Sequence, residues 1–295
     1  AGEVPDGRWG GRMLATLVER AGPPGAGRGP GSWRVRSYRA DVPARRVTFS
    51  TRRPDLTGGA SSVVLDGAGR YRLGASVPTD GDTLRLELTL DPGPRRYLPP
   101  LEVAGGAFPS GYVVPVLRGG ASGRICAGGA CRRLEEARAY HDHNWGVWRD
   151  VTWDWGEADA GPWSLVYGGI RRGAAGGSRF LFLTDSLGFA GLLPVRSVEA
   201  SGGPGGAAPD ALRVLAGEGG DSLSLRVDVR QARTSTREGG AAGPSGPSPA
   251  EDLFHQMFGA ARLEGRLRGA PVEAAARGFF ETWTRAPAEA SAGGD

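Results

Sequence analysis

Residues 83–90 read TLRLELTL, a strict alternation of polar and apolar side chains. In a β-strand, alternate side chains point to opposite faces, so the four leucines would share one face and the polar groups the other. Residues 222–230, SLSLRVDVR, repeat the pattern with apolar side chains at every second position. Both stretches therefore predict strands that are buried on one face and solvated on the other.

Short segments of similar character occur along the whole chain and predict further strands. They comprise residues 33–39, 46–50, 61–65, 70–73, 112–117, 124–126, 163–170, 179–184, 211–215, 262–268 and 277–284. Glycine-rich turns such as TGG at 57–59 and DGAG at 66–69 separate them, and turns account for most of the 51 Gly. Many short strands at this spacing favour an all-β barrel or sandwich.

One segment near the C-terminus has helical features instead. SPAE at 248–251 forms a capping box with proline at the first helical position. We expect a short helix that packs on the barrel. Its apolar residues at helical spacing are Leu253, Phe254, Met257, Phe258 and Ala261.

The basic residues exclude several enzyme classes. All 36 are arginine, because the chain contains no lysine, and asparagine occurs once, at Asn144. Both types have A/T-rich codons, so a G/C-rich genome explains their scarcity. A P-loop requires a phosphate-binding lysine and pyridoxal phosphate enzymes require a lysine amine, so both are excluded. There is no glycine-rich dinucleotide fingerprint and no G-x-S-x-G motif, and we expect no cofactor.

Charge and hydropathy limit the partners. The formal net charge is +4, and the arginines are interleaved with acidic residues rather than gathered in a stripe, so we expect no nucleic-acid partner. No apolar run approaches the roughly 18 residues of a membrane span, and residues 1–30 lack a signal-peptide core. The chain begins at Ala1 without methionine, which is consistent with removal of an upstream segment. Compartment and oligomeric state are not encoded in these patterns.

The two cysteines, Cys126 and Cys131, flank the sequence AGGA, which predicts a hairpin tip. A disulfide across the hairpin is geometrically reasonable in an oxidising compartment. Two inert thiols are the alternative, and the sequence leaves both open.

Polar and aromatic residues concentrate in residues 140–156, YHDHNWGVWRDVTWDWG. This segment holds two of the three His, the only Asn and four of the eight Trp. Where codon bias has removed asparagine elsewhere, its presence here indicates an amide whose donor and acceptor are both used.

Alternation along a strand offers two constellations in this segment. His141 and His143 would point one way and could form a metal pair, with His255 or Glu281 as a third ligand. However, Val147 and Trp148 stand where such a site would carry its carboxylate. We therefore predict no metal. Asp142 would point the other way, and in an aromatic cavity its raised pKa would make it a proton donor to an alkene. A polar network that only holds a strand connection, with tryptophans as core, explains the same residues.

The motif YHDHNWG followed by W-x-W-G, with GYVVPV at 111–116 before it, resembles the hydroxyneurosporene synthase (carotenoid 1,2-hydratase) and AttH-like lipocalin family. It is also similar to the related lipocalin-like Diels–Alderases of fungi. The resemblance implies two tandem lipocalin-like (calycin) β-barrel domains with an apolar pocket at or near their junction. We place the N-terminal domain at residues 1–135 and the C-terminal domain at residues 136–295. GFFE at 278–281 resembles the closing strand of the family.

The residue pattern and the resemblance together lead to a hypothesis for the site residues. Asp142 would be the catalytic acid, with His143 and Asn144 orienting it. The expected ligand-binding residues are Tyr140, His141, Trp145, Trp148, Trp153, Trp155, Tyr167 and Glu281. In two places the chain departs from the family: Gly168 and Gly169 replace an acidic residue after Tyr167, and the N-terminal Trp-Trp-Tyr-Phe is missing.

The implied activity is hydration or cyclisation of a large apolar polyene or isoprenoid by acid catalysis without a redox cofactor. The expected partner is therefore a carotenoid, a terpenoid or a polyketide polyene. Two alternatives stay open: a pericyclase that acts mainly by holding a polyene in a reactive shape, and a carrier without catalytic activity.

Overall fold

The computed structural model describes residues 2–3, 9–20, 33–50, 52–79, 81–103, 110–146, 152–171, 179–203, 207–236 and 252–285. Apart from one 3-10 turn, η1 (Ala44–Arg46), these residues form antiparallel strands and their connections. Contacts divide the chain into two compact units, residues 1–93 with 118–140 and residues 94–117 with 141–295. The division at 135/136 stays a prediction. Within the described part of the chain, no helix has the length and apolar character needed to cross a membrane.

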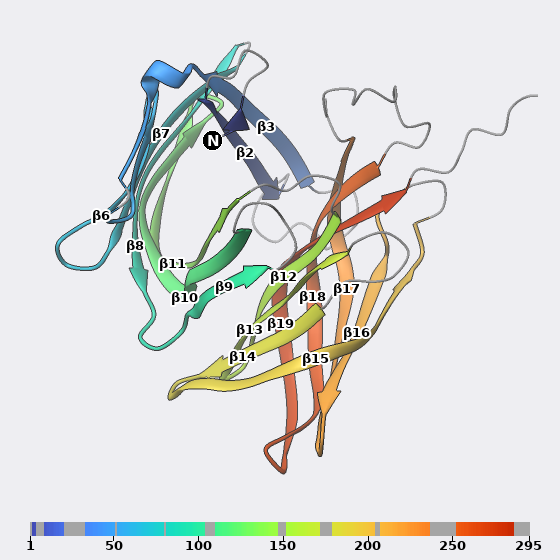
Figure 1. Ribbon diagram of the computed structural model, residues 1–295. Coiled ribbons are helices and arrows are strands. Elements are labelled where there is room, and N and C mark those ends of the chain that lie inside the picture. Colours follow the sequence, from blue (N-terminus) through green and yellow to red (C-terminus); the bar gives the residue numbers. More distant parts are fainter. Residues whose placement is uncertain are drawn as a thin grey trace, which may run out of the picture. The chain divides into compact units, whose positions relative to one another are not determined.

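The strands of the first unit belong to two open sheets, and the second of these sheets also includes residues 98–103, 110–117 and 141–145, which are grouped with the second unit. β1 (Gly2–Glu3), β2 (Trp9–Arg20) and β3 (Trp33–Val42) form a three-stranded sheet. The second sheet follows the order β11-β10-β8-β7-β6-β5-β4 and is curled (Figure 1). Its strands are β4 (Val47–Phe49), β5 (Asp55–Gly58), β6 (Ser61–Leu65), β7 (Tyr71–Thr79), β8 (Asp82–Pro92), β10 (Ser110–Ala127) and β11 (Ala130–Trp145), with β9 (Leu98–Val103) paired to the start of β10.

The alternation in residues 83–90 sets the inner face of this curled sheet. Leu84 and Leu90 on β8 are buried, while Arg85 and Glu87 between them are exposed. Leu84 packs with Tyr38 of β3 and Val77 of β7 in a small core, so the predicted half-buried strand is confirmed.

The second unit contains a closed eight-stranded barrel, as predicted for a lipocalin-like domain (Figure 1). Its strands are β12 (Thr152–Ala160), β13 (Trp163–Arg171), β14 (Arg179–Asp185), β15 (Gly188–Ser201), β16 (Ala211–Glu218), β17 (Asp221–Thr236), β18 (Asp252–Leu267) and β19 (Ala270–Arg285). Buried side chains, including Tyr167, Leu225, Met257 and Phe280, form the core inside the barrel. Leu223, Leu225 and Val227 of β17 are all buried, which confirms the second alternating stretch.

The helix predicted after residue 251 is wrong, because residues 252–267 form strand β18. β18 pairs with β17 on one side and β19 on the other along its length. Its apolar residues occupy both faces: Met257 is fully buried in the core, and Phe258 is 45% exposed on the outside. A strand with apolar groups on both faces also satisfies a helical spacing, so periodicity could not separate the two. The capping box lies outside the described residues.

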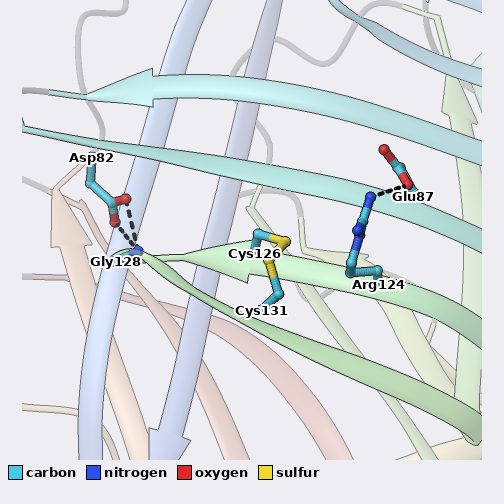
Figure 2. The surroundings of a disulfide bond; sticks show 6 residues. All are labelled: Asp82, Glu87, Arg124, Cys126, Gly128 and Cys131. Atoms are coloured by element: carbon cyan, nitrogen blue, oxygen red, sulfur yellow. Dashed lines mark hydrogen bonds and ion pairs between the residues drawn. A yellow bond between two sulfur atoms is a disulfide. The ribbon is translucent and has the colours of Figure 1, made fainter.

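The hairpin between β10 and β11 carries a disulfide (Figure 2). Cys126 and Cys131 are bonded, which decides between the two alternatives left open by the sequence. The turn between them needs glycine, because Gly128 and Gly129 have φ of 59° and 76°. The Gly128 N–H lies 2.8 and 2.9 Å from the two carboxylate oxygens of Asp82, which ties the hairpin tip to the start of β8.

Removing this disulfide is expected to destabilise the first unit. In the loop-entropy description a closed loop this short contributes about 2 kcal/mol, and the sequence separation is five residues. Cys126→Ser combined with Cys131→Ser should therefore lower the free energy of unfolding by about this amount, measured by urea denaturation. Adding a thiol reductant should have the same effect on the unaltered protein and no effect on the double variant. An equal effect of reductant on both proteins would contradict the prediction.

Candidate functional site

A cavity of about 200 Å³ lies against the outer face of the barrel, entirely within the second unit. The cavity is lined by Tyr112, Asp142, Asn144, Trp153, Trp155, Gly169, Ile170 and Glu281. Five of these were predicted from the sequence as site residues: Asp142, Asn144, Trp153, Trp155 and Glu281. The ends of β10 and β11 and the barrel strands β12, β13 and β19 supply all the lining residues.

Strand register explains why this cavity is outside the barrel. Gly156 pairs with Tyr167 and Phe280, both of which belong to the barrel core. The neighbouring Trp155 pairs with Gly168 and Glu281, so these residues face outward.

The glycines of this region make room for aromatic rings. A Cβ atom on Gly156 would lie 2.3 Å from Cδ1 of Phe280, and one on Gly168 would lie 2.5 Å from Cε3 of Trp155. The indole of Trp155 therefore packs directly on the backbone of Gly168, which is the position where the family resemblance would place an acid. The W-x-W-G glycine, Gly156, serves Phe280 on the inner side in the same way.

Aromatic rings form the wall of the cavity. Tyr112 meets Trp155 edge to face with ring centroids 5.0 Å apart and stacks on Phe180 at 5.9 Å. Trp153 meets Trp283 edge to face at 5.1 Å. Burial raises the pKa of the Tyr112 phenol, so this group stays neutral and can donate a hydrogen bond. Tyr112 was not among the predicted site residues, although the stretch 111–116 belonged to the motif.

Two carboxyl groups meet in this aromatic cavity. Burial raises the pKa of Glu281, and the negative charge of Asp142 raises it further, while hydrogen bonds from Gln256 and Trp153 oppose the shift. The Gln256 Nε2 atom donates to Glu281 Oε1 at 3.1 Å. Glu281 is therefore the group in the site that tends to hold a proton when its neighbour is ionised.

The other predicted site residues lie elsewhere. His141 is half-buried, and burial together with the neighbouring His143 lowers its pKa. His143 is exposed and stacks on Trp145 at 6.2 Å, on the face of β11 opposite to Asp142. A Cβ atom on Gly111 would lie 2.5 Å from Cζ2 of Trp145, so that indole packs on the backbone of β10.

The remaining predictions concern three aromatic residues. Tyr140 is half-buried on β11 and is grouped with the first unit. Tyr167 is 2% exposed and belongs to the barrel core rather than to the cavity lining. Trp148 lies outside the described residues.

A polar cluster inside one end of the barrel was not predicted. Asp154 on β12 accepts a hydrogen bond of 2.6 Å from Thr282 Oγ1 and forms an ion pair with Arg179 Nε at 3.2 Å. Nearby on β18, His255 is fully buried, and its Nδ1 lies 2.9 Å from Thr234 Oγ1. Burial lowers the pKa of His255. Asp154 lies between Trp153 and Trp155, which face outward. This alternation is the sequence feature that could have placed the Asp154 carboxylate inside the barrel.

His141 and His143 are the two side chains that the sequence offered as a metal pair. In the described ranges, no three His, Cys, Asp or Glu side chains are grouped so that they could hold a metal ion.

The fold and the cavity together define an all-β, lipocalin-like protein with a small aromatic site on the outside of its closed barrel. No model of a known protein family matches the chain, and no curated protein matches it in sequence.

Solved structures share the fold. A candidate AttH from Nitrosomonas europaea aligns with a TM-score of 0.54 and 17% identity, covering 96% of this chain and 89% of the other. Kievitone hydratase from Nectria haematococca aligns with a TM-score of 0.52 and 12% identity, covering 84% and 76%. CghA in complex with Sch210972 aligns with a TM-score of 0.52 and 15% identity, covering 91% and 83%.

Proposed function

We propose that the protein is a cofactor-free acid–base enzyme that adds water to, or cyclises, one end of an apolar polyene or isoprenoid. The observation that carries this proposal is the pair of carboxyl groups, Asp142 and Glu281, in a cavity walled by aromatic rings. A buried carboxyl group with a raised pKa is suited to act as an acid, and a carboxylate beside it can act as the base.

In the proposed reaction, Glu281 is the acid and Asp142 the base. The Glu281 O–H bond breaks as its proton adds to the terminal carbon of a C=C bond, and the adjacent carbon becomes a cation. The face of a Trp155 or Trp153 indole stabilises that cation. A water molecule then bonds to the cation and gives a proton to the Asp142 carboxylate, which yields an alcohol. Proton return from Asp142 to Glu281 restores the starting state.

This assignment moves the acid from Asp142, favoured by the sequence alone, to Glu281. The reason is that Glu281 has the pKa raised by burial, with the Asp142 charge as a further cause. Asn144 lies on the same face of β11 as Asp142, where its amide can hydrogen-bond the attacking water.

The size of the cavity sets the kind of ligand. Sites for whole drug-sized ligands are typically about 300–1,000 Å³, and this cavity holds about 200 Å³. It therefore suits one terminal unit of a long ligand rather than the whole molecule. The hydratase from Nectria haematococca, which shares the fold, makes hydration our first choice of reaction.

A pericyclase is the second candidate, and the glycines Gly168 and Gly169 favour it. They stand where hydratase relatives are expected to carry a further acidic residue. This site therefore has one carboxyl group fewer for proton transfer than a hydratase site would have. In this reaction the Asn144 amide or the neutral Glu281 carboxyl would donate a hydrogen bond to a dienophile carbonyl while the wall holds the polyene in a reactive shape.

The pH dependence of the rate tests these candidates. With an acyclic isoprenoid that ends in an isopropylidene group as substrate, we expect a bell-shaped dependence of kcat/KM on pH. It should rise as Asp142 ionises and fall as Glu281 loses its proton, at a pH above 4.5, the ordinary value for this group. Glu273→Gln, an exposed residue of the same strand, should leave the bell unchanged. A flat profile would favour the pericyclase, and ligand that binds and is returned unchanged would favour a carrier.

A further inference from the structure

A second apolar cavity, of about 380 Å³, lies on the outer face of the barrel beside the turn between β14 and β15. Its inner part contains Leu98, which is 1% exposed, and Phe182, which is 4% exposed. Its rim is formed by large apolar side chains that project into solvent. These are Tyr97, Leu187, Phe189 and Leu192, with exposed fractions of 55%, 78%, 59% and 46%. We call these four residues the apolar rim.

Two arginines flank the apolar rim. Arg95 is exposed and lies next to Gly188, where an added Cβ would be 3.5 Å from the Arg95 Cβ atom and 3.8 Å from its carbonyl oxygen. The Arg268 guanidinium lies 5.9 Å from the ring centroid of Phe189, and its Nη2 donates to the Phe189 carbonyl at 3.3 Å. Neither guanidinium forms an ion pair with a carboxylate among the residues that the structure describes, whereas Arg124 pairs with Glu87.

Two carboxylates in the neighbouring turns accept hydrogen bonds from the backbone. Asp185 accepts a hydrogen bond of 2.7 Å from the Leu187 N–H, and Asp221 accepts one of 2.7 Å from the Arg268 N–H. Hydrogen bonds from N–H groups disperse the charge of each carboxylate. Arg95 and Arg268 thus present cationic heads that form no ion pair in the described part of the chain, while Asp185 and Asp221 accept hydrogen bonds from backbone N–H groups.

We propose that the apolar rim and its two arginines dock on an anionic lipid surface. Leu187 and Phe189 at the β14–β15 turn would enter the boundary between headgroups and acyl chains, while Arg95 and Arg268 would contact lipid phosphates. Exposed apolar side chains bordered by cations are the combination that binds anionic membranes from the aqueous side. Each apolar group gains by leaving water, and each arginine gains from the negative surface potential.

Strand pairing argues against a protein strand as the occupant. β9, which lines the cavity and pairs only with β10 among the described strands, contains Pro99 and Pro100, which have no N–H to donate. β14 and β15 are both paired on each side in the closed barrel, so they present no free edge to which a peptide strand could add. The two arginines at the rim are complementary to phosphate, Leu187 projects from the β14–β15 turn, and Phe189 follows it at the start of β15. This inference does not depend on the reaction proposed for the other cavity.

Vesicle binding by the full chain tests the proposal. We expect the protein to co-sediment with vesicles of phosphatidylcholine and phosphatidylglycerol in a 7:3 ratio, and much less with phosphatidylcholine alone. Rising salt should weaken binding to the anionic vesicles. Leu187→Ser and Phe189→Ser should each weaken binding about tenfold. Arg95→Gln and Arg268→Gln should each weaken it about fivefold.

Matched controls exist in the first unit. Leu14 and Phe49 are each 68% exposed there, so Leu14→Ser and Phe49→Ser should leave vesicle binding unchanged. Arg124→Gln should do so as well. Equal losses in these controls, or equal binding to neutral vesicles, would overturn the proposal. A protein that does not bind vesicles, and whose dimer is converted to monomer by Leu187→Ser, would show that a second copy covers the rim instead.

Discussion

Glu281→Gln is expected to reduce turnover by about 10²- to 10⁴-fold, the usual contribution of a general acid. Glutamine keeps the size and the hydrogen-bonding capacity of the side chain, so the cavity keeps its shape, but it carries no transferable proton. Ligand affinity should change by less than about threefold, because the aromatic wall is unaltered. The measurement is kcat and Kd for an acyclic isoprenoid with a terminal isopropylidene group.

Asp142→Asn provides the partner experiment. It should cause a loss of similar size, and the low-pH limb of the profile should disappear because no base remains to be protonated. Combining the two substitutions should cost little more than either alone, since the groups act in one proton cycle. Glu273→Gln is the matched control on the same strand. Full turnover by Glu281→Gln would show that this carboxyl is not the acid, and full turnover by both variants would remove acid–base catalysis altogether.

Asp154→Ala is expected to lower the free energy of unfolding by about 3 kcal/mol, because it leaves one member of a buried ion pair without its partner. The exposed fractions of the Asp154 and Arg179 side chains are 4% and 22%, so Arg179 can recover only part of its hydration. The Thr282 hydroxyl loses its acceptor in the same substitution. Urea denaturation followed by tryptophan fluorescence is the measurement, since the barrel carries several tryptophans.

The exposed pair Arg124 and Glu87 is the matched comparison. Its side chains are 57% and 70% exposed, and Glu87→Ala should cost less than about 1 kcal/mol. Adding Arg179→Met to Asp154→Ala should restore most of the lost stability, because an apolar chain of similar length then replaces an unpaired cation. A cost below about 1 kcal/mol for Asp154→Ala would mean that water reaches this end of the barrel and hydrates Arg179.

The sequence predicted best where one face of a strand is buried and the other is wet. β8 and the first part of β17 have this property, and their leucines and valines identified both strands without further information. β18 has apolar side chains on both faces, with Met257 inside and Phe258 outside. Its pattern therefore has no single period, and a helix was predicted in place of a strand.

The candidate site was predicted in part for a related reason. Asp142, Asn144, Trp153 and Trp155 are close in sequence, and the structure brings them to one cavity with Glu281. Local sequence could not reveal which face of β12 forms the cavity, because both faces are buried: Trp155 is 9% exposed outside and Ala158 0% inside. Tyr167, which the family resemblance placed in the pocket, lies in the core, while Tyr112 of the cavity and Asp154 of the internal cluster were missed.

The filled interior of the barrel has a consequence for how this protein can change. In a barrel that holds its ligand inside, each new ligand requires a new core, and altered specificity then competes with stability. Here the core side chains and the cavity side chains occupy opposite faces of the same strands. Substitutions at Trp153 or Ile170 are expected to change the fit of the proposed ligand, while Leu165 and Phe280 on the inner faces of β13 and β19 keep the barrel folded. The scaffold is therefore suited to directed evolution, because the residues that would be randomised for a new ligand are not those that hold the barrel together.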